Sequence, residues 1–204
     1  MSYDPSIHPF EKPKGSLPRP RREGWGHRRS IRLPAYDYTT PGYYFITIAA
    51  YRRQTIFGEI TDGEMRFNAF GEIARAEWLK TPSIRRKIAL DEFIIMPNHM
   101  HGIITIIDDA RRGTATPCPY GDRSIHNPTI ERFSKPTIGS IPTIIRAYKS
   151  AVTYHINHIR HTPGVPVWQR NYWEHIIRDE DDLSRIREYI RNNPAQWETD
   201  IENG

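Results

Sequence analysis

The sequence predicts an α+β fold in which an antiparallel sheet carries helices mainly on one face. Two patterns in the chain predict this fold. Short runs of apolar, β-branched and aromatic residues come in pairs joined by turn residues, which is typical of hairpins. Longer segments repeat apolar residues every three or four positions, which is typical of amphipathic helices. The 204 residues, 37% of them hydrophobic, suffice for one domain with its own core.

The first half of the chain contains most of the expected strands. Asp62-Gly63 stands between two short alternating runs and predicts a hairpin turn. Pro97-Asn98 predicts a second turn, between two longer apolar runs. In order, we expect a strand over 43–53, a hairpin over 56–68, a helix over 69–80 and two strands over 88–97 and 99–107.

The second half is expected to contain a long loop, two helices and a further strand. Residues 108–136 are rich in Asp, Arg, Gly, Pro and Ser without a sustained period, which predicts a mobile loop. Asp179 is a good N-cap and Pro194 follows the last turn, so both ends of the final helix are marked. We expect a helix over 137–160, a strand over 167–178 and a last helix over 179–193.

Positive charge is concentrated near the start of the chain, whose formal net charge is +5. Residues 12–32 contain eight Lys and Arg residues against one acidic residue, Glu23, and are interrupted by Pro and Gly. This composition predicts a flexible basic arm, which either neutralises the phosphates of a nucleic acid or serves only as a solubilising tail. We expect the arm over 1–38, a single globular domain over 39–197 and a short tail over 198–204.

Several classes of protein are excluded by features that the sequence lacks. No run approaches the roughly 18 apolar residues of a membrane span. The first ten residues, MSYDPSIHPF, lack the apolar region of a signal peptide, so we expect a cytoplasmic protein without a membrane partner. Cys118 is the only cysteine, which excludes a disulfide within the chain and a cysteine-based zinc cluster. A bound metal would therefore need His, carboxylate or amide ligands.

Residues 96–101, MPNHMH, place two histidines one residue apart at the start of an expected strand. Alternate residues of a strand share a face and lie roughly 6.6 to 6.8 Å apart along the chain, so His99 and His101 project side by side. Two such imidazoles can converge on one cation. The alternative is that both are buried structural histidines held by hydrogen bonds.

The last expected helix supplies a matching polar pair, Tyr189 and Asn193. Residues four apart on a helix share one stripe, and here that stripe borders an apolar one. Docking the apolar stripe on the sheet would leave Tyr189 and Asn193 at the margin of the contact, where chemistry can reach solvent. The alternative is that both are ordinary residues at the edge of an amphipathic helix. The apolar stripe consists of Leu183, Ile186 and Ile190.

A second set of side chains has the character of a surface for single-stranded DNA. Such surfaces combine aromatic side chains, on which bases stack, with cations that follow the backbone. The alternative is that the aromatic residues cap the core. The candidates are Arg146, Lys149, Trp168, Arg170 and Trp173.

Two blocks of the sequence resemble the REP-associated tyrosine transposases, which belong to the HUH (histidine–hydrophobic–histidine) single-strand transposases related to insertion-sequence transposases. The blocks are IIMPNHMHGII and VWQRNYWEHIIRDEDDLSRIREYIRNNP, and the resemblance covers roughly residues 40–197. It implies a ferredoxin-like palm in which His99 and His101 bind a divalent metal, Mg²⁺ or Mn²⁺. It also implies that Tyr189 is the nucleophile and that Asn193 is the third ligand of the metal.

The resemblance further implies a function for the domain over 39–197. A transposase or nuclease of this kind cleaves and rejoins single-stranded DNA next to hairpin elements through a 5′-phosphotyrosine intermediate, as a monomer or a homodimer. The phosphoester is retained in the intermediate, which fits the absence of a P-loop sequence. Two alternatives stay open: a domesticated hairpin-DNA-binding protein with little catalysis, and a metal phosphodiesterase that uses water. Tyr148 and Tyr154 are the other tyrosines considered as nucleophiles.

Overall fold

The computed structural model describes residues 36–108 and 137–199. Most of the predicted basic arm, of the loop over 108–136 and of the tail over 198–204 lies outside the described residues. Tyr38, at the end of the predicted arm, is buried in the core and contacts Tyr44. The elements are β1 (Gly42–Ala49), a 3-10 turn (Tyr51–Arg53), β2 (Gly58–Thr61), β3 (Glu64–Phe67), α1 (Ala69–Leu79), α2 (Thr81–Ile84), β4 (Ile88–Ile95), β5 (His99–Ile106), α3 (Ile141–Ile159), β6 (Trp173–Ile177), α4 (Glu180–Asn192) and a C-terminal 3-10 segment (Pro194–Thr199).

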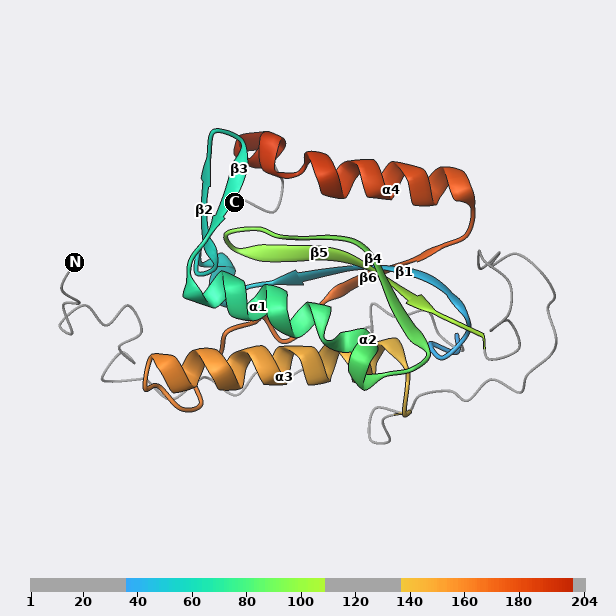
Figure 1. Cartoon of the computed structure of the whole chain (residues 1–204), viewed down its shortest axis with the longest axis horizontal. Coiled ribbons are helices and arrows are strands. Elements are labelled where there is room, and N and C mark those ends of the chain that lie inside the picture. Colours follow the sequence, from blue (N-terminus) through green and yellow to red (C-terminus); the bar gives the residue numbers. More distant parts are fainter. Residues whose placement is uncertain (1–35, 109–136, 200–204) are drawn as a thin grey trace, which may run out of the picture. The chain divides into compact units, whose positions relative to one another are not determined.

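The central sheet has four strands in the order β4-β5-β1-β6, and each neighbouring pair is antiparallel. The hairpin β2-β3 forms a separate two-stranded sheet (Figure 1). The predicted α+β class with an antiparallel sheet is therefore confirmed. None of the helices within the described ranges has the length and apolar character needed to cross a membrane.

The central sheet has a core on each face. On one face, side chains of β1 and β5 such as Ile46 and Met100 pack with α1 and α3. On the other face, Phe45 and Ile103 pack with α4 through its apolar stripe, Leu183, Ile186 and Ile190. Figure 1 shows α1, α2 and α3 on one side of the sheet and α4 on the other. Because successive strand residues face opposite sides, β5 presents His99, His101 and Ile103 to the α4 side.

Helix ends are fixed by local hydrogen bonds that the sequence specifies. The Asn68 side-chain oxygen accepts hydrogen bonds from the backbone N–H groups of Phe70 and Gly71, at 2.9 and 3.0 Å, which caps α1. Asp179 caps α4 by accepting the N–H of Asp182 at 2.7 Å, as predicted. Three acidic residues in the first turn of α4 add favourable charge at the positive end of the helix dipole.

Two strands are shorter than the apolar runs predict. The run over 43–53 leaves the sheet after Ala49, because Arg52 and Arg53 adopt left-handed backbone angles, each with φ of 57°. The run over 167–178 pairs regularly only from Trp173 to Ile177, after a single bridge between Trp168 and Ala50. Between these points the carbonyls of residues 169–171 turn toward the ammonium of Lys149 on α3, which interrupts the edge strand.

Candidate metal and nucleophile site

His99 and His101 lie side by side on the face of β5 that meets α4. Their ring centroids are 4.5 Å apart, and the two side chains are 0% and 1% exposed. β1 is the neighbouring strand, where Ala49 pairs with His99 and Thr47 with His101. The strand geometry predicted from MPNHMH is therefore found, and both rings are shielded from water.

Hydrogen bonds to Nδ1 orient both rings. Nδ1 of His99 lies 2.7 Å from the side-chain oxygen of Asn98, which can only accept, so Nδ1 donates and a neutral ring would carry its lone pair on Nε2. Nδ1 of His101 lies 2.8 Å from the hydroxyl of Thr47. Sequence reasoning missed both supporting residues, although Asn98 belongs to the motif and Thr47 is the polar residue within the apolar run YYFITIAA.

His101 is held in its neutral form. Burial lowers its pKa well below 6.5, and the positive potential of His99 and Arg53 lowers it further. A neutral imidazole is the form that binds a metal ion, because its free ring nitrogen offers a lone pair. His101 therefore has the chemical state that ligation needs.

Tyr189 of α4 brings its hydroxyl to the same place. The phenolic oxygen lies 3.2 Å from Nε2 of His101, and the two rings meet edge to face with centroids 5.1 Å apart. Phe45 stacks on the His101 ring at 5.4 Å and meets the Tyr189 ring at 6.1 Å. Tyr189 and His101, which the sequence places in separate elements, are thus in direct contact.

Asn193 lies between two residues that contact the histidines. It follows Tyr189 by four residues and precedes Trp197 by four, and the ring of Trp197 stacks on His99 at 6.1 Å with an interplanar angle of 23°. Asn193 is 1% exposed, and its buried side-chain oxygen makes no hydrogen bond within the described part of the chain. Sequence reasoning missed Trp197, although the spacing of four that selected Asn193 also reaches it.

The donor set fits a divalent cation. Two buried imidazoles, which bind metal in their neutral form, and a buried amide oxygen with an open lone pair are ligands that Mn²⁺, Mg²⁺ and Zn²⁺ accept, with water filling the remaining positions. Within residues 36–108 and 137–199, no three His, Cys, Asp or Glu side chains gather into a potential cation site. An amide ligand such as Asn193 is therefore what would complete the pair.

The side chains expected to contact DNA are divided between the two faces of the sheet. Trp173 lies on the histidine face, where it pairs with Thr47, packs against Phe45 at 5.6 Å and is 50% exposed. Arg146 and Arg170 are exposed, but Arg146 is on α3 and Arg170 lines a cleft beside it. Trp173 is thus an exposed candidate on the same face of the sheet as the histidine pair.

Trp168 and Lys149 are turned inward, which corrects the expectation that both form part of an exposed DNA surface. Trp168 is 5% exposed and packs against Phe57 and Tyr148 in the core. The ammonium of Lys149 donates to the backbone carbonyls of residues 169–171, at 2.5 to 3.3 Å. Burial lowers the pKa of Lys149 to about 8, and the three carbonyl oxygens offset part of the cost of keeping it charged.

The two alternative tyrosines lie on α3, on the other side of the sheet from the histidines. Tyr148 is buried, its hydroxyl donates to the carbonyl of Ala74 at 3.2 Å, and burial raises its pKa well above 10. Tyr154 is 68% exposed and lines a cleft of about 820 Å³ between α3 and residues 161–170. Neither tyrosine is placed to act with His99 and His101.

Comparisons with known proteins bear on the family and the fold. No protein-family model matches the chain. An uncharacterized protein of Haemophilus influenzae is 41% identical over 177 residues, which cover 87% of this chain and 93% of that protein. A putative REP-associated tyrosine transposase from the same organism is 50% identical over 30 residues, covering 15% of this chain and 17% of that protein.

A solved structure has the same fold. It is a REP-associated tyrosine transposase bound to a REP hairpin, with 21% sequence identity and a TM-score of 0.50, over 79% of this chain and 72% of that chain. The resemblance seen in the two sequence blocks is thereby confirmed. The chain belongs to the same family as the uncharacterized Haemophilus influenzae protein, and its fold is that of the REP-associated tyrosine transposase.

Proposed function

We propose that this protein is a metal-dependent single-stranded DNA transposase or nuclease that uses Tyr189 as its nucleophile. The observation that carries the proposal is the 3.2 Å approach of the Tyr189 hydroxyl to Nε2 of His101, beside a second buried histidine. The relative of the same fold is bound to a REP hairpin, which supports hairpin-containing single-stranded DNA as the partner. The buried side-chain oxygen of Asn193, which makes no hydrogen bond within the described residues, costs stability, and a role as a cation ligand would account for that cost.

The proposed reaction exchanges one phosphoester bond for another. The Tyr189 oxygen attacks the phosphorus and loses its proton to solvent, while the bond from phosphorus to the 3′ oxygen breaks. The departing oxygen takes up a proton, which leaves a free 3′-hydroxyl and a 5′-phosphotyrosine. A 3′-hydroxyl of another strand reverses these events and releases Tyr189. Because the number of phosphoester bonds is unchanged, rejoining needs no ATP.

His99, His101 and Asn193 would hold the cation, Mg²⁺ or Mn²⁺. When bound there, such an ion polarises a non-bridging phosphate oxygen and offsets charge that develops in the transition state. Asn98 and Thr47 would fix the orientation of the two rings through Nδ1, so that Nε2 faces the ion. Trp173 would stack on a base of the strand that enters the site, since its exposed ring adjoins Phe45 on the same face.

A covalent trapping assay tests the proposal. The substrate is a labelled single-stranded oligonucleotide that carries a hairpin and its flanking sequence, incubated with the protein and Mg²⁺ or Mn²⁺. We expect a labelled protein–DNA adduct on a denaturing gel. Tyr189→Phe should abolish it, His101→Ala should reduce it by at least about 100-fold, and chelation of the metal should do the same.

Tyr154→Phe is the matched control, because that tyrosine is exposed on the opposite side of the sheet and should leave adduct formation unchanged. Cleavage that persists in Tyr189→Phe would show that water is the nucleophile. Tight hairpin binding without metal-dependent cleavage in the wild-type protein would instead indicate a DNA-binding role.

A further inference from the structure

Strand β4 contains an irregularity that points two successive acidic side chains at the same helix. Its pairing with β5 is regular at both ends, but the register shifts between Leu90 and Phe93, which is a β-bulge. In a regular strand, residues 91 and 92 would face opposite sides of the sheet. Here both Asp91 and Glu92 contact arginines of α4, because the bulge re-aims one of them.

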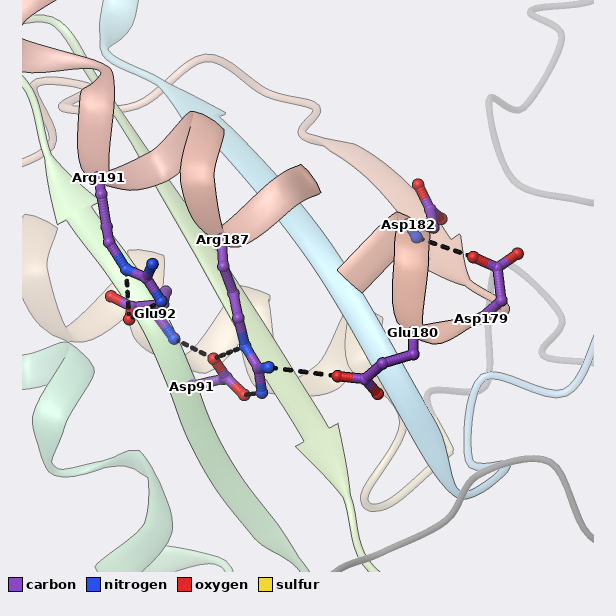
Figure 2. Close-up of polar contacts among 7 residues, drawn as sticks. All are labelled: Asp91, Glu92, Asp179, Glu180, Asp182, Arg187 and Arg191. Atoms are coloured by element: carbon purple, nitrogen blue, oxygen red, sulfur yellow. Dashed lines mark hydrogen bonds and ion pairs between the residues drawn. The ribbon is translucent and has the colours of Figure 1, made fainter. Parts of the chain in front are cut away.

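The Asp91–Arg187 pair has the geometry of a strong ion pair. Nε and Nη2 of Arg187 donate to the two oxygens of Asp91, at 2.9 and 2.6 Å (Figure 2). The side chains are only 17% and 28% exposed. Burial by itself would raise the pKa of Asp91, but hydrogen bonds from Arg187 and from the N–H of Glu92 hold it below 3.8. A two-pronged, half-buried pair of this kind fixes direction as well as distance.

Two further polar contacts attach α4 to the sheet. Arg191 donates to Glu92 at 2.9 Å one helical turn later, but this pair is exposed. On the other edge of the sheet, His175 of β6 lies 2.6 Å from the carboxylate of Asp182 in the first turn of α4. The helix is therefore tied to both edge strands of the sheet that it crosses.

These polar contacts restrict the rotation of α4 about its axis. Each helical residue advances about 100°, so Arg187 and Arg191 occupy one flank of the buried apolar stripe. Tyr189 and Asn193 occupy the opposite flank, on the side where His101 lies. Hydrophobic burial is not directional, so the apolar stripe by itself constrains the rotation less tightly than a directional contact does. The bidentate pair on the arginine flank is directional, and it thereby sets where Tyr189 points.

We propose that Asp91 and Arg187 are positioning residues that fix the rotation of α4 and so place the Tyr189 hydroxyl against His101. This inference rests on the proposed function, because its consequence is the rate at which Tyr189 attacks DNA. Neither residue contacts the reacting atoms. A small rotation of the helix would suffice, since a displacement of about 1 Å at a reacting group lowers a rate by up to about 100-fold.

The test measures the single-turnover rate of adduct formation at saturating oligonucleotide and metal, together with oligonucleotide affinity and melting temperature. We expect Asp91→Asn and Arg187→Gln to lower the rate about 10- to 100-fold while affinity changes less than about threefold. Arg187→Lys should recover little of the rate, because one ammonium cannot form the two-pronged contact. The double variant Asp91→Arg/Arg187→Asp restores a pair of opposite charges, so its rate of adduct formation should be higher than that of either single variant.

Glu92→Gln and Arg191→Gln are the matched controls. Each removes the exposed ion pair between Glu92 of β4 and Arg191 of α4. Because an exposed pair contributes little, the rate of adduct formation should change less than about threefold. Amide hydrogen exchange supplies an independent readout: Asp91→Asn should speed exchange in α4 and leave α3 unchanged.

The outcomes separate the inference from the function on which it rests. A wild-type protein that forms no tyrosine-linked adduct overturns both. A wild-type adduct whose rate is unchanged in Asp91→Asn and Arg187→Gln overturns the inference alone, even if the melting temperature falls. Rate losses that match those of the exposed control pair also overturn it.

Discussion

Tyr189 and His101 are 88 residues apart in the sequence, yet the phenolic oxygen of one lies 3.2 Å from Nε2 of the other. The contact joins α4 to the first half of β5 across the sheet face that α1 and α3 do not cover. Phe45 stacks against the imidazole from the neighbouring strand and fixes its plane. The proposed nucleophile and a proposed cation ligand are thus brought together by tertiary packing of one chain.

Asn193→Leu should separate metal binding from folding. The side-chain oxygen of Asn193 is buried and makes no hydrogen bond within the described part of the chain, so its removal should raise the metal-free unfolding free energy by about 1 kcal/mol. Added Mn²⁺ should stabilise the wild-type protein by about 2.7 kcal/mol at a concentration of about 100 Kd, and the variant much less. Thermal unfolding with and without Mn²⁺ measures both. If Mn²⁺ stabilised the variant as much as the wild-type protein, Asn193 would not be a ligand of the metal.

Thr47→Val should weaken cation binding without touching a ligand. The hydroxyl of Thr47 lies 2.8 Å from Nδ1 of His101, and loss of such a supporting bond typically costs about 10- to 100-fold in metal affinity. Calorimetric titration with Mn²⁺ measures the change. Thr105→Val is the control, because Thr105 is equally buried and faces the same side of β5 but pairs with Tyr43, away from the histidines. Equal affinities in both variants would show that Thr47 has no part in ligation.

Lys149→Met should lower stability and leave DNA binding nearly unchanged. The ammonium satisfies three backbone carbonyls, so its loss should lower the unfolding free energy by about 2 kcal/mol. Arg146→Met, one turn earlier on α3 and exposed, should be close to neutral for stability. Urea unfolding measures stability, and oligonucleotide affinity over a range of salt counts phosphate contacts. A salt slope reduced by about one in Lys149→Met would instead identify a phosphate contact.

Acid should weaken the attachment of α4 through Asp91. Its pKa is lower in the folded protein than the ordinary value of 3.8, so the folded state binds fewer protons in that range. The resulting stabilisation is complete above the ordinary value and is lost as the pH falls through the lower, folded pKa. Urea unfolding from neutral pH to about pH 3 should therefore show a shallower acid decline in Asp91→Asn than in the wild-type protein. Identical acid declines would contradict the prediction.

Local patterns predicted most of the fold because they are set by neighbouring residues. The Asp62-Gly63 hairpin, the Pro97-Asn98 turn and the Asp179 cap all lie where expected. Each depends on backbone preferences or on hydrogen bonds between residues a few positions apart.

What the sequence did not reveal depends on contacts between distant segments. Hydrogen bonds from Lys149 to three backbone carbonyls shorten β6, and no pattern within residues 167–178 predicts them. Trp168 and Trp173 look equivalent in the sequence, but one is buried and the other is exposed. The bulge in β4 is likewise visible only when the partner strand is known, since Asp91 and Glu92 alone resemble an ordinary exposed pair.

The bulge in β4 and the break before β6 have one more consequence, for association between copies of the chain. They interrupt the two outer strands of the central sheet, β4 and β6. An uninterrupted outer strand offers a row of free backbone groups on which another chain can add a strand, which leads to aggregation. Here each outer strand offers only short stretches of regular backbone, and Lys149 occupies the carbonyls at one break. The irregular strands therefore protect the sheet against edge-to-edge growth.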